Sequence, residues 1–388
     1  MRGEGKLARL GRGMGRIAKR VFAVIASLVL LVVVVVSCYV AYLMITYNRI
    51  GDAQAVKVEH DASDKVLQVG EEYVVTSYNI GFGAYPPEYS FFMDEGIMED
   101  GTRTVGAHSV AASEASVVTC TKGAIATIEG IHPDFALFQE VDTDSTRSYG
   151  VNQKELIEAA FPRMGSAFAV NYHTSFLAYP IPEMHGFVNS GILSLSGSHV
   201  SSAFRRSFPI DEGFPAKFFD LDRCFLVERV QVGNGHDLVL INCHMSAFDE
   251  GGKIRAKQLA LLMGFVAQEA NAGHYVIVGG DYNHALCRSE NLYPSHQRVP
   301  PWLKSFDAST LPNGFSVVEP DNLAEVATCR GADIPYEKGV TYSITIDGFI
   351  VSSNVEATAH NVDTQFQHSD HNPVQLTFKL APIVDPKD

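Results

Sequence analysis

The sequence predicts an α/β domain of two packed sheets flanked by helices, preceded by one transmembrane helix. A long apolar run without charges stands near the N-terminus. Beyond it, short runs rich in β-branched and aromatic residues recur along the chain, as in strands. A few segments between them have the periodicity of amphipathic helices. Many strands with fewer helices favour two sheets packed face to face with helices outside them.

The N-terminal region is predicted to be a membrane anchor. Residues 1–20 carry seven basic residues against a single acidic one, and no charge occurs from Val21 to Asn48. That run exceeds the roughly 20 apolar residues that cross a bilayer, and it is longer than the apolar region of a cleaved signal peptide. By the positive-inside rule, we expect a cytoplasmic tail over 1–20, a transmembrane helix over 21–47, and the rest of the chain outside the cytoplasm. Lipidation of Cys38, which follows a loosely lipoprotein-like sequence, is left open.

The rest of the chain is predicted to be one acidic domain with short flanking segments. Residues 48–70 are polar and weakly patterned and are expected to form a tether, followed by a domain over 71–381 and a tail over 382–388. Beyond the basic tail, 23 basic residues face 43 acidic ones. A domain this acidic has no general attraction for polyanions, so tight non-specific binding to duplex nucleic acid is not expected. The sequence indicates no obligate protein partner.

The cysteines of the domain argue against a zinc site and against a disulfide framework. They form no C-x-x-C pair, and they are five in number beyond Cys38. Cys224 and Cys243 lie in apolar, strand-like runs and are predicted to be buried thiols. A single disulfide is left open.

Three segments are predicted to be helices. The clearest covers 253–270, where apolar residues fall near one face and Asn271 to Gly273 end the pattern. The other two cover roughly 113–130 and 154–161.

Polar side chains follow or precede several predicted strands at their ends. Because strand ends meet at the edge of a sheet, side chains placed there build a site in the crevice outside it. Any one of these residues is weak evidence, whereas the whole set predicts a site on one rim. The set is Asn79, Glu140, His244, Asp281, Asn283, Asp347, Asp370 and His371.

The motifs around these residues resemble the endonuclease/exonuclease/phosphatase superfamily, in the order in which that superfamily has them. The resemblance implies a four-layer α/β/β/α sandwich of two mostly antiparallel sheets, and a metal-dependent hydrolase acting on phosphate esters. GGDYN and SDHNPV together are the specific part of the signal, and SYN or QEV alone would mean little. The matching pieces are SYNIG at 77–81, QEV at 139–141, NSGILS at 189–194, INCHMS at 241–246, GGDYN at 279–283, IDGFIVS at 346–352 and SDHNPV at 369–374.

Glu140 is the expected ligand of Mg²⁺ or Mn²⁺, with an amide oxygen from Asn79 and a second carboxylate from Asp370. Magnesium prefers few carboxylates and several waters, which fits this sparse set. Without the other motifs, Glu140 would be interpreted as a solvated residue at a strand end.

Two groups of residues are expected to carry out the chemistry. By resemblance, Asp281 activates water and Asn283 holds a phosphate oxygen, although Asp-x-Asn after Gly-Gly is otherwise more typical of a turn or cap. Asp347 would fix the tautomer of His371 and raise its pKa, so that the protonated ring donates to phosphate. His244 would supply a second imidazole on the other side of the scissile phosphate.

For the residues that contact substrate, the sequence leaves alternatives open. Arg223 could reach phosphate with its guanidinium or form a structural ion pair, and Tyr172 and Asn189 are weaker candidates for lining the site. The insertion over 85–112 carries four aromatic residues that either contact substrate or, as we expect, pack the insertion onto the domain. A nucleic acid, a phospholipid and an inositol phosphate all stay open as substrates. The alternative is a catalytically inactive ligand-binding module on the same fold.

Overall fold

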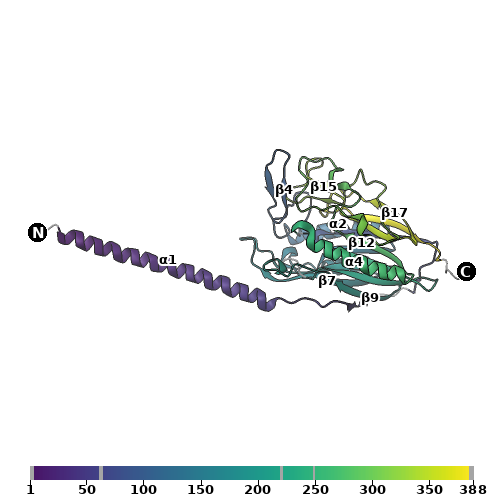
Figure 1. Ribbon diagram of the computed structural model, residues 1–388, viewed down its shortest axis with the longest axis horizontal. Helices are drawn as coiled ribbons and strands as arrows, with labels where there is room; N and C mark the ends of the chain where they lie inside the picture. The colour runs from purple at the N-terminus through teal and green to yellow at the C-terminus, as the bar shows by residue number, and fades with distance from the viewer. Residues whose placement is uncertain (1–3, 61–63, 219–221, 248–249, 384–388) are drawn as a thin grey trace. The chain divides into compact units, whose positions relative to one another are not determined.

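A computed structural model of the chain describes residues 4–60, 64–218, 222–247 and 250–383. The chain divides into two compact units, residues 1–48 and Arg49–Asp388. The first unit contains one helix, and the second contains both large sheets and the remaining helices (Figure 1). Residues 1–3 of the expected basic tail and 384–388 of the expected C-terminal tail lie outside the described residues.

The first unit is a single helix, α1, over Glu4–Thr46. Its part Ile17–Thr46 is long and apolar enough to cross a membrane by length and composition, and none of its most apolar window is buried against protein. The structure differs from the expected division at residue 20, because the helix continues through the basic segment. Leu, Ala, Lys and Arg in that segment favour helix, and extending a formed helix is easier than starting one.

The first large sheet has seven strands, and only β11 and β12 pair in parallel. In spatial order the strands are β1 (Gln54–Val56), β9 (Val200–Ser207), β10 (Cys224–Gln231), β11 (Asp237–His244), β12 (Tyr275–Asp281), β16 (Asp347–Ser352) and β13 (Phe315–Val317).

The second large sheet also has seven strands, and only β3 and β6 pair in parallel. Its order is β17 (Val355–Asn361), β18 (Val374–Leu380), β3 (Glu72–Asn79), β6 (Phe135–Asp142), β8 (Gly186–Ser196), β7 (Gly165–Leu177) and β2 (Val58–Glu59). Two small ribbons accompany the sheets, β4 (Glu95–Ile97) with β5 (Arg103–Val105), and β14 (Cys329–Arg330) with β15 (Ser343–Ile344).

The two sheets pack face to face with helices on both outer faces. Along β12, Tyr275 and Ile277 face the other sheet, whereas Val276 and Val278 pack against α4 (Lys253–Asn271). Such strands, buried on both faces, read as continuous apolar runs. On the other side, α2 (Glu114–Ile131) and α3 (Gln153–Ala160) cover the second sheet (Figure 1). The four-layer sandwich of mostly antiparallel sheets and the three predicted helices are therefore confirmed.

A buried amide pair joins the two sheets between their apolar faces. Gln139 of β6 donates from Nε2 to Asn242 Oδ1 of β11 at 2.8 Å. Asn242 donates in turn to the backbone oxygens of Phe138 and Leu193 at 3.2 and 3.1 Å. Buried polar groups are stabilising only when they have partners, and here the partners lie across the sheet interface.

Part of the segment expected to form a tether pairs with both large sheets. Its residues 54–56 and 58–59 form the edge strands β1 and β2, which pair with β9 and β7. Val56 and Val58 pack against the core between the sheets, and this burial explains why so short a polar segment attaches to both sheet edges. All six cysteines are free, and Cys224 and Cys243 are buried as predicted.

Candidate active site

Three neighbouring strands of the first sheet bring His244, Asp281 and Asp347 to one edge. His244 ends β11 and lies opposite Asp281, which ends the parallel strand β12. Asp281 in turn lies opposite Asp347, the first residue of the antiparallel strand β16. The register places all three at the same end of the sheet, and each is at most 2% exposed.

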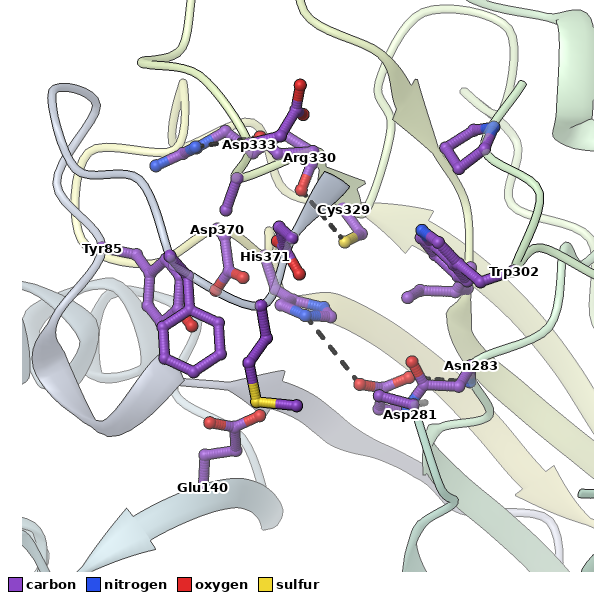
Figure 2. A pocket seen from close by; sticks show the side chains of 18 of the residues that line it. Tyr85, Glu140, Asp281, Asn283, Trp302, Cys329, Arg330, Asp333, Asp370 and His371 are labelled. Atoms are coloured by element: carbon purple, nitrogen blue, oxygen red, sulfur yellow. Dashed lines mark hydrogen bonds and ion pairs between the residues drawn. The ribbon is translucent and has the colours of Figure 1, made fainter. Parts of the chain in front are cut away.

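The second sheet contributes its residues from the matching end. Asn79 ends β3, and Asp370 and His371 immediately precede β18, which pairs with β3. Glu140 is not at a strand end as expected, because β6 continues to Asp142 through a bulge. Glu140 has a φ of 54° there, a left-handed conformation that is uncommon outside glycine. Bulges re-aim side chains, and this one points the carboxylate into the site (Figure 2).

Asp281 is the common neighbour of both histidines. Its Oδ2 lies 3.8 Å from His371 Nε2 and 3.6 Å from His244 Nε2. Asn79 Nδ2 donates to the same oxygen at 3.1 Å. Burial, followed by the nearby carboxylate of Asp347, raises the pKa of Asp281 above its usual value. A carboxyl group with a raised pKa is a better base near neutral pH than an ordinary aspartate.

The surroundings of the two imidazoles shift their pKa values in opposite directions. Burial alone would lower the pKa of His371, but Asp347, whose Oδ2 lies 2.8 Å from His371 Nδ1, raises it well above its usual value. Burial and the cation of Arg223 lower the pKa of His244 well below its usual value. Arg223 Nη1 lies 3.1 Å from His244 Nε2. These shifts favour the protonated, hydrogen-bond-donating form of His371 and the neutral form of His244.

Glu140 and Asp370 fit a hard divalent cation. Both are half-buried and line the same cleft, and burial together with Asp370 raises the pKa of Glu140 against the lowering effect of Arg147. Carboxylates gathered in this way repel one another, and carboxylate oxygens are what Mg²⁺ prefers. Asp281, Asp347 and His371 also have ligand atoms within 4.8 Å of one another. His371 Nδ1 and Asp347 Oδ2 are already joined at 2.8 Å, so we favour Glu140 and Asp370.

Asn79 does not turn its amide oxygen toward the cleft, as a metal ligand would. Its amide nitrogen instead hydrogen-bonds two carboxylates. Its Nδ2 donates to Glu140 Oε1 at 3.4 Å as well as to Asp281, and its Oδ1 accepts from Gly81 N at 3.0 Å. Gly81 has a φ of +52°, and a Cβ there would lie 2.9 Å from Asp370 Oδ1. The SYNIG segment thus orients the carboxylates and leaves room for Asp370.

Asn283 reaches the site through a turn. β12 ends at Asp281, and Asn283 takes a φ of 49° while its N–H donates to Asp281 Oδ1 at 2.8 Å. We expected Asn283 to point the same way as Asp281 on a continuing strand, but the turn places it instead. Its Nδ2 donates to Met245 O at 2.9 Å, and the residue lines the cleft.

The cleft above these residues includes two of the three residues that the sequence offered as substrate contacts. Tyr172 and Arg223 line it, together with Trp302, Cys329 and Arg330 among others. Asn189 does not line it, because β7 and β8 pair so that Ser190 lies opposite Tyr172. Successive residues of a strand point to opposite faces, so the exposed Asn189 faces away. In Figure 2, Glu140, Asp370, Asp281 and His371 point toward the same space from different elements.

Arg147 is a cleft residue that the sequence did not single out. Its guanidinium forms two hydrogen bonds with the buried carboxylate of Asp142, at 2.8 and 3.0 Å. It also lies over the ring of Phe82 at 3.9 Å and that of Tyr172 at 5.5 Å. In the sequence, an acidic and a basic residue five positions apart, shortly after Glu140, could have indicated this ion pair.

The insertion over 85–112 packs onto the domain as expected and also forms one wall of the cleft. Tyr85, Tyr89 and Phe91 are buried in a cluster with Phe82, and Tyr85 and Phe91 line the cleft. Asp94 of the same insertion lines the cleft too, and burial, with Asp370 and Asp333 nearby, raises its pKa to about 7. The environment of Asp94 had no signal in the sequence, because it comes from residues far along the chain.

Comparison with known proteins identifies the fold. No model of a known protein family matches the chain, and no characterised protein matches it in sequence. Among solved structures, an endonuclease/exonuclease/phosphatase protein from Beutenbergia cavernae aligns with 80% of this chain and 72% of its own, at 17% identity and a TM-score of 0.54.

Two further solved structures align over most of the chain. ANGEL2, a 2',3'-cyclic phosphatase, aligns with 87% of this chain and 100% of its own, at 13% identity and a TM-score of 0.51. TDP2 of Caenorhabditis elegans covers 80% of this chain and 99% of its own at 14% identity, with a TM-score of 0.47. The first two likenesses, together with the two mixed sheets and their flanking helices, show that the globular unit has the four-layer fold of endonuclease/exonuclease/phosphatase proteins.

Proposed function

We propose that the chain is a membrane-anchored, metal-dependent hydrolase of phosphate esters. The observation that supports this most strongly is the position of Asp281, whose Oδ2 lies within 4 Å of Nε2 of both His244 and His371, with Glu140 and Asp370 lining the same cleft. Hydrolysis of a phosphate ester needs a base for water, positive groups for the phosphate oxygens, and help for the departing oxygen. This set of side chains supplies each of these.

Glu140 and Asp370 would hold Mg²⁺ or Mn²⁺, with Asn79 orienting Glu140. When bound, the ion would neutralise charge on the phosphate oxygens. Asp281 orients water and takes its proton, and the protonated His371 donates a hydrogen bond to a phosphate oxygen. His244 lies beside Asp281, and Arg223 Nη1 lies 3.1 Å from His244 Nε2; both would contact the phosphate or the leaving group.

We also propose that α1 spans a membrane with the basic segment in the cytoplasm. The catalytic unit would then lie on the opposite side of the membrane, outside the cytoplasm. The length and apolarity of Ile17–Thr46 support a span, and the charge bias of the preceding residues supports this orientation. Added protease should digest the catalytic unit on intact cells if this orientation is right. Digestion only after the membrane is opened would contradict it.

A panel of phosphate esters tests the proposed activity on the full chain in detergent. It would hold bis(p-nitrophenyl) phosphate, DNA, RNA, sphingomyelin, phosphatidylinositol phosphates and inositol phosphates. We expect turnover that is lost in EDTA and restored by Mg²⁺ or Mn²⁺. Glu140→Ala and Asp281→Ala should each lower turnover by at least about a hundredfold, the scale for a main electrostatic or acid/base group.

The matched control is Glu356→Ala, which removes an exposed carboxylate from β17 and should leave turnover unchanged. Titration calorimetry gives a readout independent of activity, since Glu140→Gln should weaken Mg²⁺ binding while Glu356→Gln does not. Near wild-type rates in either alanine variant would refute the site. Silence on the whole panel together with measurable ligand binding would favour the inactive binding module.

A further inference from the structure

One edge of the catalytic unit exposes large apolar side chains to solvent. Three of them belong to the segment that joins β7 to β8, two to the adjoining ends of these strands, and one to the loop that precedes β10. Soluble proteins rarely gather such residues without a partner, and aromatic residues with Ile and Met are typical of surfaces that contact lipid. We call this set the apolar edge: Phe176 (38% exposed), Tyr179 (60%), Ile181 (77%), Met184 (37%), Phe187 (40%) and Phe214 (62%).

Glu183 and His185 of the β7–β8 segment hydrogen-bond Ser109 of the insertion over 85–112. Glu183 accepts a hydrogen bond from Ser109 N at 2.6 Å through Oε2, and a second one from Ser109 Oγ through its backbone oxygen. His185 is 5% exposed, and its Nδ1 lies 2.8 Å from Ser109 O. These bonds fasten the segment to the insertion over 85–112, so its outward apolar face is held in place.

The polypeptide joins the catalytic unit beside β7, the strand that carries Phe176, and beside the loop that carries Phe214. Ile50 N donates to Asp222 Oδ1 at 2.7 Å, and Asp222 Oδ2 lies 2.5 Å from Nδ1 of His173, a residue of β7. Arg49 forms an ion pair at 3.5 Å with Glu212, in the loop that carries Phe214. Residues 47 and 48 alone separate the end of α1 from Arg49, a stretch that extends to about 10 Å at most. A bilayer that holds α1 is therefore within reach of the apolar edge.

The apolar edge continues into the wall of the cleft. Tyr179 packs its ring against Phe92 at 5.7 Å between centroids, and both residues line the cleft. Tyr172, on β7, lines it too. A surface placed against the apolar edge would thus lie beside the opening that leads to the candidate catalytic residues.

We propose that the apolar edge docks on the lipid bilayer that holds α1, and that the cleft takes phosphate esters of lipids in that bilayer. This inference rests on the proposed function and names its substrate class. Docking would be driven by burial of apolar surface. Because the unit is acidic, attraction to anionic lipid headgroups would contribute little, and docking should persist in high salt.

The docking test uses the full chain reconstituted in phosphatidylcholine vesicles that contain doxyl-labelled lipid as a quencher. A bimane group is attached to Ile181→Cys or, as a matched control, to Val105→Cys, an apolar residue 58% exposed on β5. Signal from the chain without an added cysteine is subtracted. We expect quenching at position 181, in low and high salt, and none at position 105. Equal quenching at both positions would overturn the docking surface, whatever the enzyme hydrolyses.

The substrate test compares a double variant, Ile181→Ser with Phe214→Ser, against the control pair Val105→Ser with Leu292→Ser. Neither changed pair lines the cleft. In vesicles that contain phosphatidylcholine, sphingomyelin and phosphatidylinositol phosphates, the double variant should lose at least about tenfold of its lipid hydrolysis, since two large apolar contacts are removed. Its turnover of soluble bis(p-nitrophenyl) phosphate should be unchanged, and the control pair should retain both activities.

Lipid hydrolysis that is absent or unaffected, while the soluble ester is turned over, would overturn the lipid assignment and leave the phosphoesterase proposal standing. Loss of turnover on every substrate in the unaltered chain would instead refute the proposed function, with quenching still deciding whether the edge docks.

Discussion

Replacing Arg147 with methionine should destabilise the catalytic unit by about 3–5 kcal/mol, the range for breaking a buried ion pair by removing one partner. Arg147 is 5% exposed, Asp142 is fully buried, and two hydrogen bonds of 2.8 and 3.0 Å join them. Methionine fills part of the space of the arginine but leaves the carboxylate without its cation. The remaining hydrogen bond from Ser148 Oγ, at 2.8 Å, cannot replace a full positive charge.

The single tryptophan of the chain provides the assay. Trp302 lines the cleft, so its fluorescence should report unfolding of the catalytic unit in urea. With an unfolding slope of about 3 kcal/mol per molar urea, the expected loss lowers the midpoint by more than about 1 M. The matched control is Arg103→Met, because Arg103 is 79% exposed and contacts Glu95 only at 3.8 Å, and its loss should change the midpoint little.

A second substitution separates charge from packing. Asp142→Asn combined with Arg147→Met removes both charges, and it should recover much of the stability that Arg147→Met alone loses. Equal midpoints for Arg147→Met and Arg103→Met would refute the reasoning. A double variant no more stable than Arg147→Met would show that the loss came from packing over Phe82 and not from the uncompensated carboxylate.

Two further predictions concern pH and backbone space. Burial, with Arg147 nearby, lowers the pKa of His185 to about 4, so between pH 6.5 and 4 the unfolded chain binds a proton that the native state does not. The free energy of unfolding should therefore fall by about 3 kcal/mol in total as the pH drops through this window. His185→Gln should flatten this part of a series of urea midpoints measured against pH, and an unchanged slope would contradict the prediction. At Gly280, with a φ of +147°, a Cβ would lie 1.9 Å from Cys243 O, so Gly280→Ala should force β11 and β12 apart and lower the free energy of unfolding by more than about 4 kcal/mol. Gly264→Ala, where a Cβ meets nothing within 4 Å on helix α4, is its control, and equal urea midpoints for the two variants would contradict the prediction.

Five residues of the candidate site could be predicted because each stands at or close to a strand end. His244, Asp281 and Asp347 follow directly from the alternation of apolar strands and polar ends, and the order of motifs along the chain indicated which ends belong together. Asn79 and His371 followed in the same way from the second sheet. A strand end is a local property, so the sequence displays it.

Features that depend on pairing were not predictable from the sequence. The bulge that re-aims Glu140 is a mismatch between β6 and β8, and neither strand reveals it alone. Ser190 faces the cleft in place of Asn189 because of the register of β8 on β7. The edge strands at 54–56 and 58–59 are too short to show alternation, and they form because larger strands offer them an edge.

The amide pair between Gln139 and Asn242 has a consequence for how the two halves of the site stay matched. Glu140 comes from one sheet and His244 from the other, so their separation depends on how the sheets slide over each other. Apolar packing is non-directional and resists such sliding weakly. A 2.8 Å hydrogen bond between the amides of two fully buried side chains resists it strongly. Gln139 precedes Glu140 directly, and Asn242 lies two residues before His244, so the alignment is fixed next to the residues that need it. Provided that this pair is kept, the part of the candidate site that the sheets carry, which includes Glu140, His244 and Asp281, should stay aligned when the loops around the cleft diverge.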